Sequence, residues 1–218
     1  MTVLVNDVTA QRDPAVSDPA VPDPAGPEVS AHGGVGAKDR IMATADELFY
    51  HEGIRAVGVD RLISESRVTK ATFYKHFGAK ETLIVSYVNA RHDADRALLD
   101  ELVGSSTSPE GALHAIVDNI VDQVRGLRFR GCAFINAATE FPDNHHVVRE
   151  VVSAHRDWYT AFMADLFRRL GHPMPGDAAD EFMLLRDGTM AGGNASDPIA
   201  ASAALQRCID RLLTDSRA

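Results

Sequence analysis

The chain has 218 residues, of which 45% are hydrophobic and 24% charged, and its formal net charge is −9. These values indicate a soluble globular protein with enough residues for one large domain or two small ones, and no apolar run is long enough to span a bilayer. Cys132 and Cys208 lie far apart without metal-ligand spacing, and no secretory signal is recognisable, so we expect a reduced cytoplasmic protein without membrane association, metal or cofactor.

The first 37 residues have a composition of their own. They include the stretch RDPAVSDPAVPDPAGPEVSAHGGVG, which is rich in proline and glycine, and their net charge is −4. A segment with so little apolar surface cannot offset the entropy lost on ordering. We therefore predict that residues 1–37 form a disordered acidic arm.

Helical periodicity begins at Lys38. Apolar residues recur at the spacing of one helix face up to a glycine that provides a stop, in the set Ile41, Ala45, Leu48, Phe49 and Gly53. A short second helix is predicted from Gly58 to Ser66 and a third from Thr69 to Phe77. Thr69 is a good N-cap for the third helix, and Phe73 and Phe77 share one of its faces.

The remainder of the chain is also predicted to be helical. A long fourth helix starts at about Lys80, and a fifth starts at the Ser-Pro-Glu sequence of residues 108–110. A short sixth helix ends near Pro142, and a long seventh ends at Gly171. Two further helices are predicted over residues 177–192 and 198–214, the last one capped by Asp197. No segment alternates with the period of a strand, so the predicted class is all-α with about nine helices.

The second and third helices form a candidate helix-turn-helix. Only four of the 22 basic residues are lysines, and three of them lie within residues 68–83. Residues 38–80 carry a net charge of +2, whereas the residues after them carry −7. If Phe73 and Phe77 pack inward, the third helix presents small and basic side chains that suit the major groove of DNA.

Residues 38–84 resemble the DNA-binding domain of the TetR/AcrR family of bacterial transcriptional regulators. The resemblance lies in the strings LFYHEGIRAVGV, VDRLISESRVTKATFYKHF and AKETLI. It implies contacts to DNA bases from Lys70, Ala71, Thr72 and Lys75. It implies contacts to the DNA backbone from Thr69, Tyr74, His76 and Lys80.

Three residues depart from the family pattern. Arg67 stands where the turn usually has glycine, so its position must tolerate a side chain, which could reach a phosphate. Gly58 and Ala79 replace better helix caps, each at a cost of a few tenths to about 1 kcal/mol.

For residues 85–218 the resemblance implies a helical domain that binds a small-molecule effector and pairs with a second chain. The effector candidates are mostly aromatic residues of the fourth to eighth helices: Tyr87, Phe134, Asn136, His155, Trp158, Tyr159, Phe162 and Met183. The candidates for a homodimer interface are apolar residues of the last two helices: Phe182, Met190, Leu205, Ile209 and Leu212.

The function implied is that of a repressor released from a palindromic double-stranded DNA operator by a small, mostly apolar effector. One alternative is a regulator that activates transcription or has no small-molecule effector. Another is an enzyme built on a helical bundle, but the sequence has no nucleophile elbow, no usable Cys/His pair and no paired carboxylates in an apolar setting. We therefore do not expect an enzyme.

Overall fold

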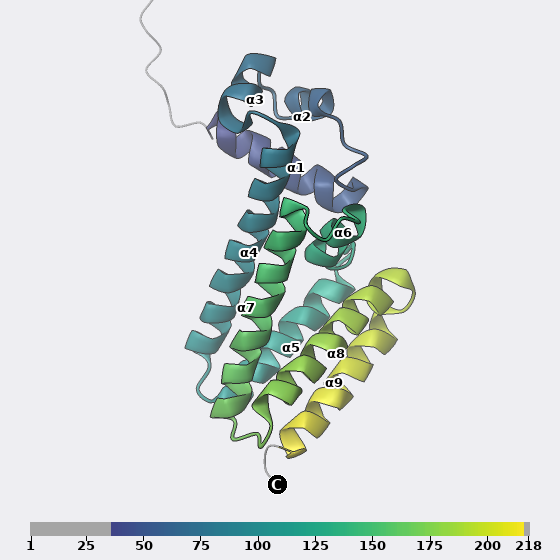
Figure 1. The fold of residues 1–218 in the computed structure, drawn as a ribbon. Coiled ribbons are helices and arrows are strands. Elements are labelled where there is room, and N and C mark those ends of the chain that lie inside the picture. Colours follow the sequence, from purple (N-terminus) through teal and green to yellow (C-terminus); the bar gives the residue numbers. More distant parts are fainter. Residues whose placement is uncertain (1–35, 216–218) are drawn as a thin grey trace, which may run out of the picture. The chain divides into compact units, whose positions relative to one another are not determined.

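The computed structural model describes residues 36–215, and the predicted arm therefore lies almost entirely outside the described residues. Residues 36–215 are helical without a strand, which confirms the predicted all-α class (Figure 1). None of the helices in this part is both long and apolar enough to cross a membrane. The helices are α1 (Ala37–Glu52), α2 (Val59–Glu65), α3 (Lys70–Phe77), α4 (Lys80–Ser105), α5 (Pro109–Arg125), α6 (Ala133–Glu140), α7 (Val147–Arg169), α8 (Pro175–Ala195) and α9 (Pro198–Asp215).

Several helix ends follow directly from capping residues. Gly53, with φ 94°, ends α1 in a backbone conformation that favours glycine. The Thr69 hydroxyl accepts a hydrogen bond from the Thr72 N–H at the start of α3, and the Ser108 hydroxyl accepts one from Gly111 at the start of α5. Gly53 and Thr69 thus mark the end of α1 and the start of α3, and the predicted ends of the first three helices agree with the structure to within one residue or so.

The eighth helix is longer than predicted at both ends. It begins at Pro175, because proline suits the first turn of a helix, and it continues through Gly192 and Gly193 to Ala195. A Cβ atom added at Gly193 would overlap the Val124 side chain of α5. The glycine thus allows α8 to pass close to α5, and the helix continues beyond residue 192, where the prediction ended it.

Helices α1, α2 and α3 pack around one small apolar core. The buried face of α1 is the one that the periodicity predicted, and Leu62 of α2 joins it. Phe73 is fully buried and Phe77 is 4% exposed, with 6.1 Å between the two ring centroids. Burial of these two rings anchors α3, which confirms that both phenylalanines point inward.

The long helix α4 joins the first three helices to the others (Figure 1). It contacts α1 and α3, and it also contacts α5, α6 and α7. Helix α8 packs along both α7 and α9. The predicted boundary between residues 84 and 85 falls inside α4, so the division into a DNA-binding and an effector-binding domain remains a prediction.

Candidate nucleic-acid interface

The face of α3 opposite its two phenylalanines is open to solvent. Thr69, Lys70, Ala71, Tyr74, Lys75 and His76 are exposed, and Thr72 is half-buried. Lys70 Nζ lies 4.0 Å from Asp60 Oδ1, but both side chains are so exposed that solvent screens the pair. Positive charge and hydrogen-bond donors are therefore available on this face, next to small residues that allow close approach.

The start of α3 is held by two threonines. Thr69 Oγ1 accepts a hydrogen bond from the Thr72 backbone N–H at 3.1 Å, and it also lies 2.8 Å from Thr72 Oγ1. Capping satisfies one of the N–H groups that a helix start leaves unpaired. The two side chains predicted to contact DNA here are thus already held in position.

The turn between α2 and α3 contains a strained residue. Arg67 has φ 53° and, among residues 36–215, it alone combines a positive φ with a side chain. This conformation costs a residue with a Cβ roughly 1–2 kcal/mol, whereas glycine adopts it freely. Glycine would relieve this strain, and the exposed Arg67 side chain stands beside the start of α3.

Lys80 differs from the other predicted DNA-contacting residues because it is bound within the protein. Its Nζ donates a hydrogen bond to the Ile54 carbonyl oxygen at 2.6 Å and lies 5.8 Å from the centre of the Phe49 ring. Partial burial lowers the pKa of Lys80 below its usual value. A phosphate at this position would have to share the ammonium group with Ile54.

A carboxylate at the end of α6 holds the turn that follows α1. Glu140 Oε1 accepts a hydrogen bond from the Ile54 N–H at 2.8 Å, and Oε2 accepts one from the Arg55 N–H at 2.7 Å. The same glutamate lies against Gly53, whose φ is positive. Sequence reasoning missed this contact, because about 85 residues separate the partners and no local pattern marks Glu140.

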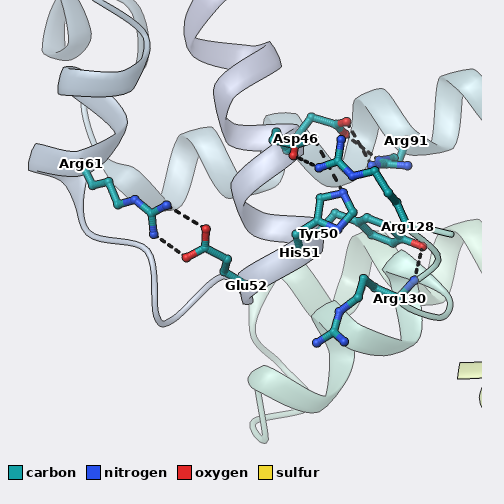
Figure 2. Close-up of polar contacts among 9 residues, drawn as sticks. Asp46, Tyr50, His51, Glu52, Arg61, Arg91, Arg128 and Arg130 are labelled. Carbon is teal, nitrogen blue, oxygen red and sulfur yellow. Dashed lines mark hydrogen bonds and ion pairs between the residues drawn. The ribbon is translucent and has the colours of Figure 1, made fainter. Parts of the chain in front are cut away.

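Polar contacts also fasten α1 to α4 and to the segment before α6 (Figure 2). The Tyr50 hydroxyl accepts a hydrogen bond from the Arg130 N–H and donates one to the Gly131 carbonyl oxygen, both at 3.0 Å. Arg91 of α4 pairs with Asp46 through two hydrogen bonds of 2.6 and 3.0 Å, and its guanidinium lies over the Tyr50 ring. The helix that supports α2 and α3 is thus linked to two other parts of the fold.

The predicted effector residues do not form a single site. Phe134, His155, Trp158, Tyr159 and Phe162 form a cluster of aromatic rings, in which Phe134 stacks on His155 with 3.4 Å between ring centroids. The cluster occupies its own volume, so most of these rings are packing residues and not the wall of a large hollow. Burial lowers the pKa of His155 to about 3, which keeps its ring neutral near neutral pH.

The other three predicted effector residues lie apart from the ring cluster or have no ring contact with it. Tyr87 packs edge-on against Phe49 of α1. The Asn136 side chain donates to the Arg130 carbonyl oxygen at 2.8 Å, and it faces a polar hollow that Tyr50 and Glu140 also line. Met183 is a buried residue of α8. Tyr87 and Asn136 therefore belong to the contact between α1 and its neighbours.

Two small cavities do lie among helices α4 to α8, and Tyr50 of α1 also lines the second. Their volumes are about 20 and 50 Å³, and Asp95, Gln123, Arg186 and Met190 line both. Tyr159 lines the first cavity and Phe134 the second. The polar residues of this lining were missed by sequence reasoning. Arg186 could have been noticed as a lone arginine on the apolar face of α8, at helical spacing from Met190 and Phe182.

The residues predicted for the dimer interface are buried within the single chain. Phe182, Met190, Leu205, Ile209 and Leu212 are each at most 4% exposed. Their side chains already pack in the core and offer almost no surface to a partner. The large exposed apolar side chains of the same two helices are Leu184, which is 73% exposed, and Ile199, which is 69% exposed.

Within residues 36–215, no three histidine, cysteine, aspartate or glutamate side chains are grouped so that they could hold a metal ion. His146 caps α7 by accepting a hydrogen bond from the Val148 N–H.

Comparison with known proteins agrees with the geometry of α2 and α3. The family model for bacterial regulatory proteins of the tetR family matches residues 41–87. A solved TetR-family transcriptional regulator from Streptomyces coelicolor is 38% identical to this chain with a TM-score of 0.80, and the match covers 83% of this chain and 95% of that one. A TetR transcriptional regulator from Legionella pneumophila, at 17% identity, has the same fold with a TM-score of 0.74, over 83% of this chain and 98% of that one.

A curated protein from Bacillus subtilis gives a shorter match. The HTH-type transcriptional regulator LmrA is 27% identical over 85 residues, which is 38% of this chain and 45% of LmrA. The similarity therefore spans less than half the length of that relative. The proteins matched are transcriptional regulators and not enzymes.

Proposed function

The chain belongs to the TetR family of bacterial transcriptional regulators, and from that premise we propose that it represses transcription in the cytoplasm until a small-molecule effector releases it from its operator. One observation carries the DNA-binding part of this proposal. Phe73 and Phe77 are buried, whereas Lys70, Ala71 and Lys75 are exposed on the opposite face of the same helix. A helix held in this way can enter a major groove without leaving the protein core.

Side chains near the start of α3 read the bases in this proposal. Lys70 donates to guanine O6 or N7, Thr72 contacts a thymine methyl, and Ala71 and Lys75 complete the contact. The phosphate backbone is contacted by neighbouring residues, namely Thr69, Tyr74, His76 and Lys80. The hydrogen bond between Lys80 and the Ile54 carbonyl supports a positioning role for this lysine as well, since the same ammonium links α4 to the turn after α1.

The chain acts as a homodimer in this proposal. Two-fold symmetry places the two α3 helices about one turn of DNA apart, roughly 34–36 Å, so the operator is a near-palindrome. The surface that we assign to the partner chain is the exposed side of α8 and α9, which includes Leu184 and Ile199. These two residues replace the buried set that the sequence suggested.

Release requires two states that differ in the spacing of the two α3 helices. An effector can shift their balance only by its difference in affinity for the two states. Helix α4, which contacts both α1 and α7, is the connector in this proposal, and the Glu140 contact adds α6 as a second one. The same short helix that ends at Glu140 contributes Phe134 to the lining of a cavity, which supports a direct link from the cavity to the turn after α1.

A gel-shift titration with DNA from upstream of the protein's own gene tests the proposal. The unmodified protein should retain the fragment against excess competitor DNA, with an affinity that falls steeply as salt rises. The double variant Lys70→Ala, Thr72→Ala should lose about tenfold or more of its preference for this fragment. Arg168→Ala, which removes an exposed cation from α7, is the matched control and should bind like the unmodified protein.

Unchanged preference in the double variant would rule out base reading by α3. Transcription from the same promoter, measured with and without the protein, separates repression from the alternative of activation.

A further inference from the structure

A buried guanidinium lines both cavities, and one of its nitrogens lacks a hydrogen-bond partner in the described part of the chain. The Arg186 side chain is 5% exposed, and its Nη1 donates to Asp187 Oδ1 at 3.0 Å. Both Nη atoms lie 3.7–3.8 Å from the Cys132 sulfur, which is only a weak acceptor. Within residues 36–215, Nε of Arg186 has no hydrogen-bond partner. Burial of a cation is costly unless its charge is paired and its N–H groups are bonded, so Arg186 is under-satisfied.

The nearby carboxylates do not complete the pairing. Asp187 Oδ2 also contacts Arg156 Nη1 at 2.7 Å, so two guanidinium groups share one carboxylate. Asp95 lines the same two cavities, yet no ion pair joins it to Arg186 in this part of the chain. Burial raises the pKa of Asp95, and the positive charge of Arg186 opposes that rise, so the Asp95 carboxylate competes with any outside acceptor for Arg186. No group among residues 36–215 accepts a hydrogen bond from Nε of Arg186, so the site has an open position for an acceptor.

The cavities limit what this acceptor can be. They measure about 20 and 50 Å³, which leaves room for a group of only a few heavy atoms. Gln123 lines both cavities and is exposed, so a small solute can reach them from the α5 side. A carboxylate suits this space, because its two coplanar oxygens match two N–H groups of a guanidinium.

We propose that Arg186 binds the carboxylate of a small organic acid that enters past Gln123. That this acid is the effector, or the acidic end of a larger one, rests on the function proposed above; the binding itself does not. The prediction of a mostly apolar effector is replaced by one that carries a negative charge. Tyr159, whose ring lies 4.9 Å from the guanidinium carbon, then packs against the bound acid.

Acetate is the probe, because it is a small carboxylate. Acetamide is the control, because it has a similar size and shape but no charge. Trp158 is the chain's single tryptophan, and its ring centroid lies 5.7 Å from that of Tyr159, so its fluorescence reports on the cavity. Acetate replaces chloride at constant ionic strength in a titration of the full chain. We expect a saturable change with acetate and none with the same concentrations of acetamide.

Variants assign the binding to Arg186. Arg186→Gln should raise the dissociation constant for acetate about tenfold or more, whereas Arg168→Gln, at an exposed site on α7, should leave it unchanged. Asp95→Asn removes the carboxylate that competes for the same cavities, and it should tighten acetate binding several-fold. If Arg186→Gln does not fold, the Asp95 variant decides the question by itself.

Three results would overturn the inference. They are a fluorescence response that does not saturate, an equal response to acetamide, and a variant Asp95→Asn that binds acetate no more tightly than the unmodified protein. Saturable binding that survives in folded Arg186→Gln would also overturn it.

Gel shifts on the same samples separate this inference from the proposed function. Retained DNA binding without acetate binding removes the acid site only. Acetate binding that depends on Arg186 in a protein that binds no DNA leaves the site intact and removes the regulator proposal.

Discussion

The exposed cations of α3 and the buried cation of α8 use positive charge in two different ways. Lys70 and Lys75 remain in water, so they can meet many arrangements of phosphates and base edges at little desolvation cost. Arg186 lies in the interior, where its charge requires a partner of defined size and geometry. An exposed cationic face thus suits a long polyanion, whereas a buried guanidinium selects among small ligands.

The contacts that hold α3 in place differ in kind from some of those that hold α1 to the rest of the chain. Apolar packing of Phe73 and Phe77 holds α3 to α1 and α2. Besides the packing of Phe49 on Tyr87, α1 and the turn after it are held by hydrogen bonds that involve Glu140 and Tyr50 and by the pair between Arg91 and Asp46. Apolar packing resists displacement, whereas a few directional contacts can be exchanged at a smaller cost, which is the property that a switch between two states requires.

Removal of an α3 anchor should have the largest effect. Phe73→Ala should lower the free energy of unfolding by about 3–5 kcal/mol, because the ring is fully buried. Urea denaturation followed by circular dichroism measures the loss. Tyr74→Ala is the control from the exposed face of the same helix and should change the free energy by less than about 0.5 kcal/mol. Equal losses for the two variants would mean that the buried and exposed faces of α3 are wrongly assigned.

Loss of the Glu140 carboxylate should have an intermediate effect. Glu140→Ala leaves the N–H groups of Ile54 and Arg55 without their acceptor, so we expect a loss of about 1–3 kcal/mol in the same assay. Glu150→Ala, at an exposed position on α7, should stay within about 0.5 kcal/mol of the unmodified protein.

Glu140→Ala also tests whether α6 links the acetate site to DNA binding. The variant should still bind acetate, since Glu140 does not line the cavities of Arg186, but acetate should then change its affinity for DNA less than in the unmodified protein. A variant whose DNA affinity responds fully to acetate would exclude α6 as a connector.

Relief of the strained turn should have the smallest effect. Arg67→Gly should raise the free energy of unfolding by about 1 kcal/mol, because glycine adopts a φ of 53° without strain. Ser64→Gly, at an exposed helical position of α2, should instead lower it by roughly 0.5–1 kcal/mol.

If Arg67 contacts a phosphate, the same variant should also bind DNA with a salt slope reduced by about one. A more stable variant with an unchanged slope would show that the arginine has no role on DNA.

Local patterns predicted the first three helices well, and they failed in identifiable places further along. Thr69 and Gly53 act on their own or adjacent turns, so their effect is visible in a few residues of sequence. The pair Gly192 and Gly193 resembles a helix stop, but packing against Val124 keeps it inside α8. The aromatic residues of α7 suggested a pocket, and in the fold they fill one another's space.

By itself, the sequence determined the all-α class, the inward turn of Phe73 and Phe77, and the basic face of α3, because each depends on spacings within one or two helical turns. Only the packing of distant segments set the partners of Arg186, the hydrogen bonds from the turn after α1 to Glu140, and the burial of Leu205 and Ile209. Such contacts join residues far apart in the chain, and whether a charge or an apolar side chain faces water or protein depends on which helices come to cover it.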